Sequence, residues 1–145
     1  MDQTALFQKL VAFTSAVYQV KCDLTKGVKS DEITPLQYSI LEYIAVSQPV
    51  TPSQISDCMH VSMPNTSREL KKLTAKNLCG RFTAADDRRK QYIRLSPEGQ
   101  ALMNESFQQI EARFRQRIKD MSEEELAEIS HAFDVLHTKV FHPRT

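Results

Sequence analysis

Apolar residues in the first 24 positions of the chain recur at the spacing of an α-helix. One stripe advances in steps of four, three, four, three and four residues and consists of Leu6, Leu10, Phe13, Val17, Val20 and Leu24. A second stripe, on another side of the same helix, contains Phe7, Val11 and Tyr18. A helix that is apolar on two sides is either deeply buried or shared between its own core and another subunit.

Two further apolar stripes follow near the C-terminal end of the chain. The first contains Met103, Phe107, Ile110, Phe114 and Ile118, and the second contains Leu126, Ile129, Phe133, Leu136 and Val140. Such stripes can belong to an intramolecular core, but three long helices exceed what a small central domain can cover. We therefore predict that residues 1–30 and 97–142 form the helical dimerisation region of a homodimer.

Capping residues mark where the other helices begin. Thr34-Pro35-Leu36-Gln37 and Thr51-Pro52-Ser53-Gln54 repeat one pattern, in which Thr caps the helix, Pro takes its first position and Gln reaches back to the cap. Ser122-Glu123-Glu124-Glu125 is a third capping box. Ser62 can cap a further helix, and Ser96-Pro97-Glu98 opens another with an acid at the positive end of its dipole.

These signals predict short helices over 35–47, 52–59 and 63–76, followed by strands over 78–83 and 91–95. Asn77 stands where the third helix needs a left-handed residue, and Asn is the best substitute for Gly there. Three helices followed by a hairpin are the order of a winged helix-turn-helix, here residues 34–96. The predicted fold of the single chain 1–145 is mainly α with a small two- to three-stranded β-wing, flanked by long N- and C-terminal dimerisation helices.

The net charge of +1 conceals a strongly basic segment. Residues 62–96 hold nine Lys or Arg against three Asp or Glu, which gives this segment +6 and leaves −5 for the remainder of the chain. Such an asymmetry, concentrated in one part of a nearly neutral chain, is typical of a protein that binds a polyanion.

The helix predicted over 63–76 has two chemically different sides. At about 100° per residue, one side contains Met63, Thr66, Leu70, Leu73 and Asn77 and is expected to face the core. The opposite side presents Asn65, Arg68 and Lys72, flanked by Pro64 and Lys71. Because Asn and Arg suit adenine and guanine edges and Lys suits phosphate or guanine, these five residues are predicted to contact the major groove of double-stranded DNA. An ordinary solvated helix face is the alternative.

The tip of the predicted hairpin carries three consecutive cations, Arg88, Arg89 and Lys90. Asp87 can hydrogen-bond within the turn and pair with one of the two arginines, which would brace the loop while the other arginine points outward. An arginine inserted into a narrow A·T-rich minor groove is attracted by its enhanced negative potential. The tip is therefore predicted to bind DNA through Arg88, Arg89 and Lys90, and a solvated turn is the alternative.

Residues 87–99, DRRKQYIRLSPEG, resemble the wing signature of the MarR family of bacterial winged helix-turn-helix transcription regulators. That signature reads D-x-R, three residues, an aliphatic residue, one residue, L-[ST], two residues and G. Residues 73–81, LTAKNLCGR, are similar to the end of the family's recognition helix and its first wing strand, with Asn77 where Gly is usual. The resemblance extends over essentially the whole chain, including the long terminal helices.

This resemblance implies a function as well as a fold. It implies a homodimeric, sequence-specific transcription regulator, often a repressor, that binds a pseudo-palindromic operator and dimerises through its terminal helices. Many members of the family release DNA when they bind a small effector, which is frequently aromatic or anionic.

An enzyme, a cofactor site and a metal site are not predicted. The chain has no Gly-rich phosphate loop, no nucleophile elbow and no metal-ligand spacing. The four histidines are scattered, and His131 and His137 would lie nearly opposite each other on a helix. A winged-helix module that binds protein instead of DNA remains an alternative, against which the basic helix face argues.

Cysteine usage and the N-terminus favour a cytoplasmic protein that does not enter a membrane. Cys22, Cys58 and Cys79 are odd in number and form no CxxC pair, as expected of a reduced compartment. The N-terminus begins acidic and continues amphipathic, unlike a secretory signal, and no apolar run approaches the length of a membrane span. A regulator that senses oxidants through one of these thiols is a further alternative.

Overall fold

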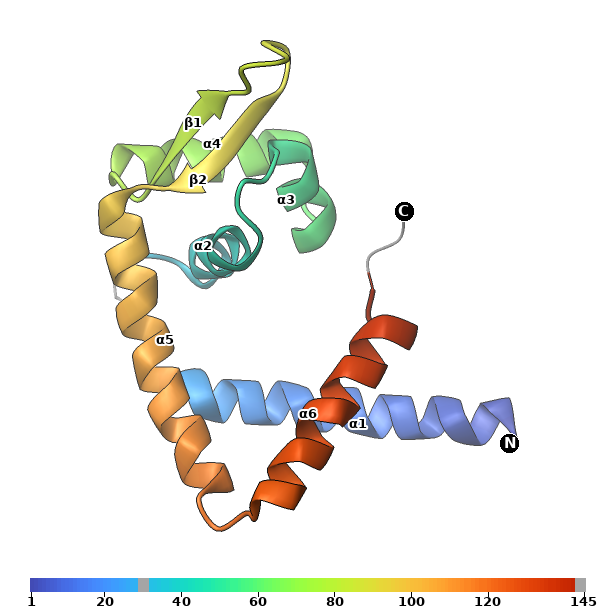
Figure 1. Ribbon diagram of the computed structural model, residues 1–145. Coiled ribbons are helices and arrows are strands. Elements are labelled where there is room, and N and C mark those ends of the chain that lie inside the picture. Colours follow the sequence, from blue (N-terminus) through green and yellow to red (C-terminus); the bar gives the residue numbers. More distant parts are fainter. Residues whose placement is uncertain (29–31, 143–145) are drawn as a thin grey trace. The chain divides into compact units, whose positions relative to one another are not determined.

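The computed structural model describes residues 1–28 and 32–142, and its elements follow the predicted order. The helices are α1 (Gln3–Thr25), α2 (Pro35–Ser47), α3 (Pro52–Met59), α4 (Met63–Ala75), α5 (Pro97–Ile118) and α6 (Glu123–Lys139), and the strands are β1 (Cys79–Thr83) and β2 (Gln91–Leu95) (Figure 1). The chain divides into two compact units, Met1–Ile110 and Glu111–Thr145. Every predicted element is present, with bounds that differ by one residue for α4 and β1.

All three predicted capping boxes are formed. Thr34 Oγ1 accepts from the backbone N–H of Gln37 at 3.1 Å, and Gln37 Oε1 accepts in return from the N–H of Thr34 at 3.1 Å. The boxes of α3 and α6 have the same reciprocal bonds. Because these bonds satisfy donors that a helix start leaves unpaired, the capping residues determine where the helices begin.

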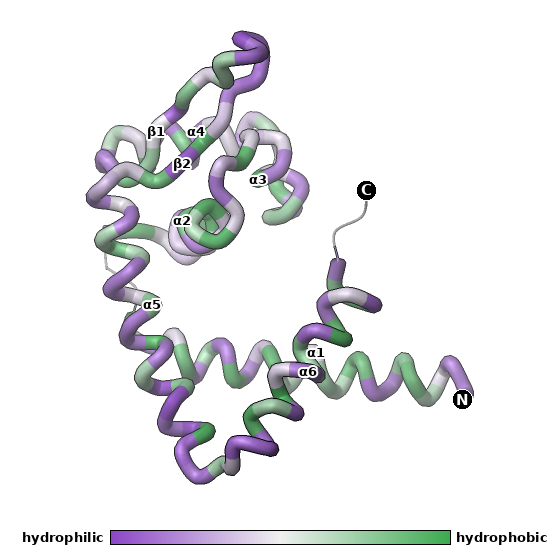
Figure 2. Tube along the Cα trace, viewed as in Figure 1, coloured by the Kyte–Doolittle hydropathy of each residue, from purple (hydrophilic) through white to green (hydrophobic). Residues whose placement is uncertain are grey.

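A core of apolar side chains joins α2, α3, α4 and the start of α5 to the hairpin. Its fully or nearly fully buried members are Ile40, Leu41 and Ile44 of α2, Ile55 of α3, Leu70 and Leu73 of α4, Ile93 and Leu95 of β2, and Met103 of α5. Figure 2 shows α2 as a largely hydrophobic helix, whereas the tip of the hairpin is hydrophilic. The core therefore supports α4 and the hairpin from the same side.

The two strands form an antiparallel hairpin in which Cys79 pairs with Leu95 and Thr83 pairs with Gln91. A single bridge adds Val50 on the other side of β2: the Val50 N–H donates to the Ile93 carbonyl at 3.1 Å, and the Ile93 N–H donates back at 2.6 Å. The wing is thus a two-stranded sheet extended by one residue. The predicted fold class, mainly α with a small wing, is confirmed.

The end of α4 turns into β1 through a left-handed residue, as predicted. Asn77 has φ of 61°, and its N–H donates to the Thr74 carbonyl at 2.9 Å. The next N–H, of Leu78, donates to the Leu73 carbonyl at 3.0 Å. These bonds close the carbonyls at the helix end and direct the chain into the hairpin.

The base of the hairpin is joined to the first turn of α5 by Ser96. Its hydroxyl donates to the Asn77 carbonyl at 2.6 Å and accepts from the Gly99 N–H at 2.9 Å, while its own N–H donates to the Leu78 carbonyl at 3.1 Å. The approach is so close that a Cβ at Gly99 would lie 1.9 Å from the Leu78 carbonyl oxygen. Only glycine fits at this position.

The terminal helices expose much of their apolar surface. Within the described residues, α1 and α6 each contain no buried side chain. The exposed apolar residues of α1 are Leu6, Phe7, Val11, Phe13, Val17 and Tyr18, and those of α6 are Leu126, Phe133 and Val135. The core of the winged region does not include the two stripes of α1, and the dimerisation region stays a prediction.

In the part of the chain that the structure describes, no helix combines the length and the hydropathy that crossing a membrane requires.

Gly99→Ala is expected to lower the free energy of unfolding by about 3 kcal/mol, because the new methyl group would overlap a backbone carbonyl that cannot move aside. Gly80→Ala is the matched control, since a Cβ at Gly80 meets nothing within 4 Å. Its effect should stay within about 1 kcal/mol. Urea denaturation of both variants measures the difference, and equal stabilities would show that the close approach to Leu78 is not a constraint.

Candidate nucleic-acid interface

Helix α4 presents a basic side to solvent and an apolar side to the core. Its N-cap Ser62 accepts from the Asn65 N–H at 3.2 Å, and Pro64 lies in the first turn. Thr66, Leu70 and Leu73 are fully buried, whereas Pro64, Arg68, Lys71 and Lys72 are exposed and Asn65 is half-buried. The structure thus brings the five predicted contact residues of this helix to one accessible surface.

Two residues predicted to face the core do not. Met63 is 45% exposed, because at the first position of α4 it lies beside the wing and the start of α3 instead of against the core. Asn77 is exposed because the chain has already left the helix there. The prediction of their burial is wrong, because both residues lie at the ends of the helix, where the helical-wheel projection does not predict what a side chain contacts.

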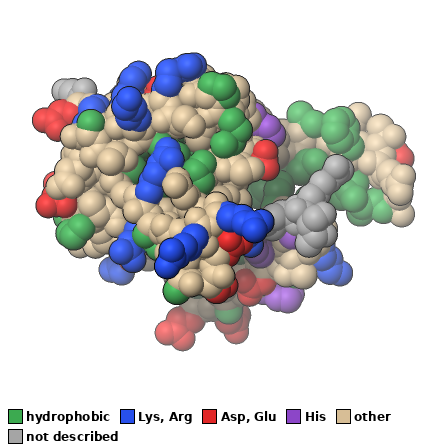
Figure 3. Space-filling model, turned by 90° about the horizontal axis from the view of Figure 1, so that it is seen from above, with side chains coloured by type: hydrophobic (Ala, Val, Ile, Leu, Met, Phe, Trp, Pro, Cys, Tyr) green, Lys and Arg blue, Asp and Glu red, His purple; other side chains and the backbone are tan. Residues whose placement is uncertain are grey.

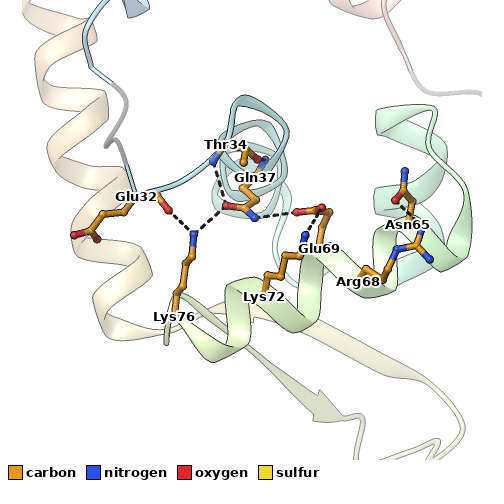
Figure 4. Close-up of polar contacts among 8 residues, drawn as sticks. All are labelled: Glu32, Thr34, Gln37, Asn65, Arg68, Glu69, Lys72 and Lys76. Atoms are coloured by element: carbon orange, nitrogen blue, oxygen red, sulfur yellow. Dashed lines mark hydrogen bonds and ion pairs between the residues drawn. The ribbon is translucent and has the colours of Figure 1, made fainter.

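The side chains on the exposed face of α4 are ordered by bonds along the helix. The Arg68 guanidinium donates to Asn65 Oδ1 at 2.9 Å, so the two side chains are held together (Figure 4). Lys72 Nζ lies 3.5 Å from Glu69 Oε1, and 61% of the Lys72 side chain is exposed. An exposed pair of this kind is weak, so the Lys72 ammonium can also interact with an external anion.

The turn at the tip of the hairpin is held by Asp87. Its carboxylate accepts from the Arg89 N–H at 2.9 Å, and its carbonyl accepts from the Lys90 N–H at 3.2 Å. Among residues 1–28 and 32–142, Asp87 forms no ion pair with Arg88 or Arg89, in contrast to the pairing expected from the sequence. The carboxylate is directed at the backbone, which leaves both arginine side chains exposed.

An aromatic and cationic ladder on the outer face of the hairpin was not expected from the sequence. Phe82 and Tyr92 pair across the strands, with ring centroids 5.8 Å apart and planes inclined by 28°. The Arg94 guanidinium lies over the Phe82 ring, 4.4 Å from its centroid. The strand register could have revealed this ladder, because side chains that lie opposite each other on one face of a hairpin interact.

The wing and the helix starts border one open hollow. Arg89 and Lys90 of the wing line it together with Thr51 and Gln54 at the start of α3 and Met63 at the start of α4. Figure 3 views the molecule from the end at which the wing lies in Figure 1 and shows Lys and Arg side chains at several places on that face. We call the exposed cations of α4 and of the wing tip together the basic face: Arg68, Lys71, Lys72, Arg88, Arg89 and Lys90.

Two of the three thiols, those of Cys58 and Cys79, have a raised pKa. Burial raises the pKa of the Cys79 thiol above its usual range, although a hydrogen bond from Thr74 and the charge of Arg81 act in the opposite direction. Burial also raises the pKa of Cys58. A raised pKa lowers the thiolate fraction, the form that reacts with oxidants.

Among residues 1–28 and 32–142, no three His, Cys, Asp or Glu side chains come together in a group that could hold a metal ion.

Comparison with known proteins identifies relatives of this fold. A sequence model of the MarR family matches residues 33–90. The homoprotocatechuate degradative operon repressor of Escherichia coli is 28% identical over 107 residues, which cover 74% of this chain and 72% of that repressor.

Solved structures extend the likeness to nearly the whole chain. A MarR family protein from Bacillus stearothermophilus has 16% identity and a TM-score of 0.80, over 98% of this chain and 99% of that chain. FabT of Streptococcus pneumoniae, solved in complex with DNA, has 23% identity and a TM-score of 0.63, over 94% and 96% of the two chains. The fold predicted from the sequence is the fold of these proteins, and the family model matches most of the winged helix-turn-helix, so this part of the chain is similar to the MarR family.

Proposed function

We propose that this protein is a sequence-specific DNA-binding repressor that acts in the cytoplasm as a homodimer on a pseudo-palindromic operator. The observation that carries the proposal is the basic face: the exposed side of α4 and the tip of the wing both carry cations, and Arg89 and Lys90 of the wing line one hollow with Met63 at the start of α4. In this arrangement α4 enters the major groove and the wing reaches the adjacent minor groove.

Reading of the operator is assigned to the first half of α4. Arg68 and Asn65 lie in the first two turns, and their mutual hydrogen bond holds the guanidinium in one orientation. An oriented guanidinium can donate two bonds to a guanine edge. Lys71 and Lys72 follow one turn later and meet phosphates, as does Lys90 of the wing.

The homodimer is supported by the apolar surface of the terminal helices. Phe7 of α1 is 61% exposed, Tyr18 of α1 is 71% exposed, and Phe133 of α6 is 57% exposed. Soluble proteins rarely leave such surfaces uncovered. Residues 1–30 and 97–142 therefore form the subunit interface, and two copies of the winged region, residues 34–96, bind two half-sites.

Release by a small aromatic or anionic effector completes the proposal, supported by the resemblance to MarR regulators. A redox regulator is disfavoured by the raised pKa values of Cys58 and Cys79. A module that binds protein would not need a basic face whose Arg68 is oriented by a hydrogen bond to Asn65.

Selection from a random DNA pool tests the proposal. The recovered sequences should share a pseudo-palindrome with half-sites about one helical turn apart, because a two-fold dimer presents two copies of α4 to one side of the duplex. Sedimentation of the free protein should show a dimer. A single species of 16.6 kDa, or selected sequences without two-fold symmetry, would contradict the proposal.

Arg68→Ala should weaken operator binding by about 1–3 kcal/mol per half-site and relax the preference at one base pair, because a base-edge contact is lost. Lys72→Ala is the matched comparison on the same face. It should weaken binding to all sequences alike and reduce the salt dependence by about one unit per phosphate contact. Titrations across a salt series separate the two effects, and equal behaviour of both variants would remove the assigned roles.

Arg88→Ala and Arg89→Ala test the wing, because one of these arginines should enter the minor groove. Replacing the inserted arginine should weaken operators with A·T-rich flanks most, since those grooves are narrow and strongly negative. Replacing the other should affect all flanks equally. Binding to a panel of flank sequences measures this, and unchanged affinity of both variants would make the tip a solvated loop.

A further inference from the structure

The two Thr-Pro-x-Gln boxes of the chain are alike in sequence but differ in what the glutamine contacts. Both glutamines accept from the backbone N–H of their cap residue, at 3.1 Å for Gln37 and 2.9 Å for Gln54. Gln54 is exposed. Gln37 is only 3% exposed and has further partners on another helix. Capping alone does not explain the environment of Gln37.

The amide of Gln37 lies between two charges that α4 and the residue after it supply. Its Nε2 donates to Glu69 Oε2 at 2.9 Å, and its Oε1 accepts from Lys76 Nζ at 3.3 Å (Figure 4). Lys76 Nζ also donates to the Glu32 carbonyl, in the chain just before α2. The carboxylate of Glu69 pairs in turn with Lys72 through its other oxygen.

This arrangement has a consistent polarity. The carbonyl end of the amide faces a cation and the amino end faces an anion, so each bond polarises the next and strengthens it. The same polarity fixes which end of the Gln37 amide is oxygen, because only the amino end can donate to a carboxylate. We call Gln37, Glu69 and Lys76 the polar bridge.

The polar bridge connects Gln37 of α2 to two positions along the axis of α4. Glu69 and Lys76 are seven residues apart, which is about two turns or 10 Å along a helix. The apolar contacts of Leu70 and Leu73 hold α4 close to the core, but apolar contacts are not directional and do not fix its rotation. Hydrogen bonds at two positions along the helix do fix its rotation. They thereby also fix the direction in which Arg68, on the exposed side, points.

We propose that Gln37 and Glu69 are positioning residues for DNA recognition: from a buried site that contacts no DNA, they set the rotation of α4 and so the fit of its side chains to base edges. The proposal rests on the proposed function, in which α4 reads the operator. Phosphate contacts tolerate a small rotation of α4, whereas base contacts do not. The polar bridge is therefore expected to determine specificity, which we define as the ratio of operator affinity to affinity for random duplex.

Gln37→Glu separates positioning from capping. A glutamate keeps the capping box, as Glu125 does in α6, but it places a carboxylate against Glu69 where an amide donor was. The specificity ratio of Q37E should fall about tenfold, a change corresponding to the loss of one hydrogen bond to a charged group. Affinity for random duplex, which reports the added negative charge alone, should change much less.

A second substitution, at the hydrogen-bond partner Glu69, should restore the specificity ratio. Glu69→Gln alone should keep the ratio, because the amide oxygen of the new side chain can still accept from Gln37. In the double variant Q37E/E69Q the direction of the bond is reversed, and the ratio should return to within about twofold of wild type. Asp57→Asn is the control, an acid-to-amide exchange at an exposed position of α3 outside the basic face, and should leave the ratio unchanged.

Titrations of the selected operator and of a random duplex of equal length, with thermal unfolding of each variant, decide the outcome. Should Q37E fail to fold, Glu69→Ala, which leaves the box of α2 intact, must lower the ratio instead. An unchanged ratio for the folded Q37E or E69A variant, or a folded double variant that is not rescued, overturns the inference alone. A wild-type protein without preference for its operator overturns the proposed function and this inference with it.

Discussion

The winged region depends on the close approach between the first turn of α5 and the backbone that follows α4. At this junction Ser96 bonds to the Asn77 carbonyl, to the Leu78 carbonyl and to the Gly99 N–H, and Gly99 leaves no room for a side chain. The last turn of α4, the base of the hairpin and the start of α5 therefore meet within one set of bonds. These contacts fix how the end of α4, the hairpin and α5 join one another at this point.

The basic face combines two kinds of support. Beneath it, apolar side chains hold α4 and β2 close to α2 without specifying their rotation. Around it, directed polar contacts supply the orientation: the Asp87 carboxylate on the Arg89 N–H, the Arg94 guanidinium over Phe82, and the amide of Gln37 on Glu69. The cations themselves remain exposed, so they lose their hydration water only when a partner binds.

The elements and their caps could be predicted from local chemistry, because Thr34, Thr51, Ser62 and Ser122 act on residues three positions away. The left-handed conformation of Asn77 could be predicted for the same reason. The burial of Gln37 could not, since the identical box around Gln54 is exposed and only tertiary contacts distinguish them. The fixed need for Gly99 likewise depends on Leu78, 21 positions earlier in the chain.

The exposed apolar surface of α1 has a consequence for how the folded state responds to dilution. A helix of 23 residues without a buried side chain gains little from its own subunit, and most of the stability of a helix in a protein comes from the packing of its apolar face. In the proposed homodimer its order is provided by the partner, so folding of α1 is coupled to association by mass action. In that dimer, the helical content and the thermal midpoint become functions of protein concentration, so the amount of protein present governs its structure as well as its assembly.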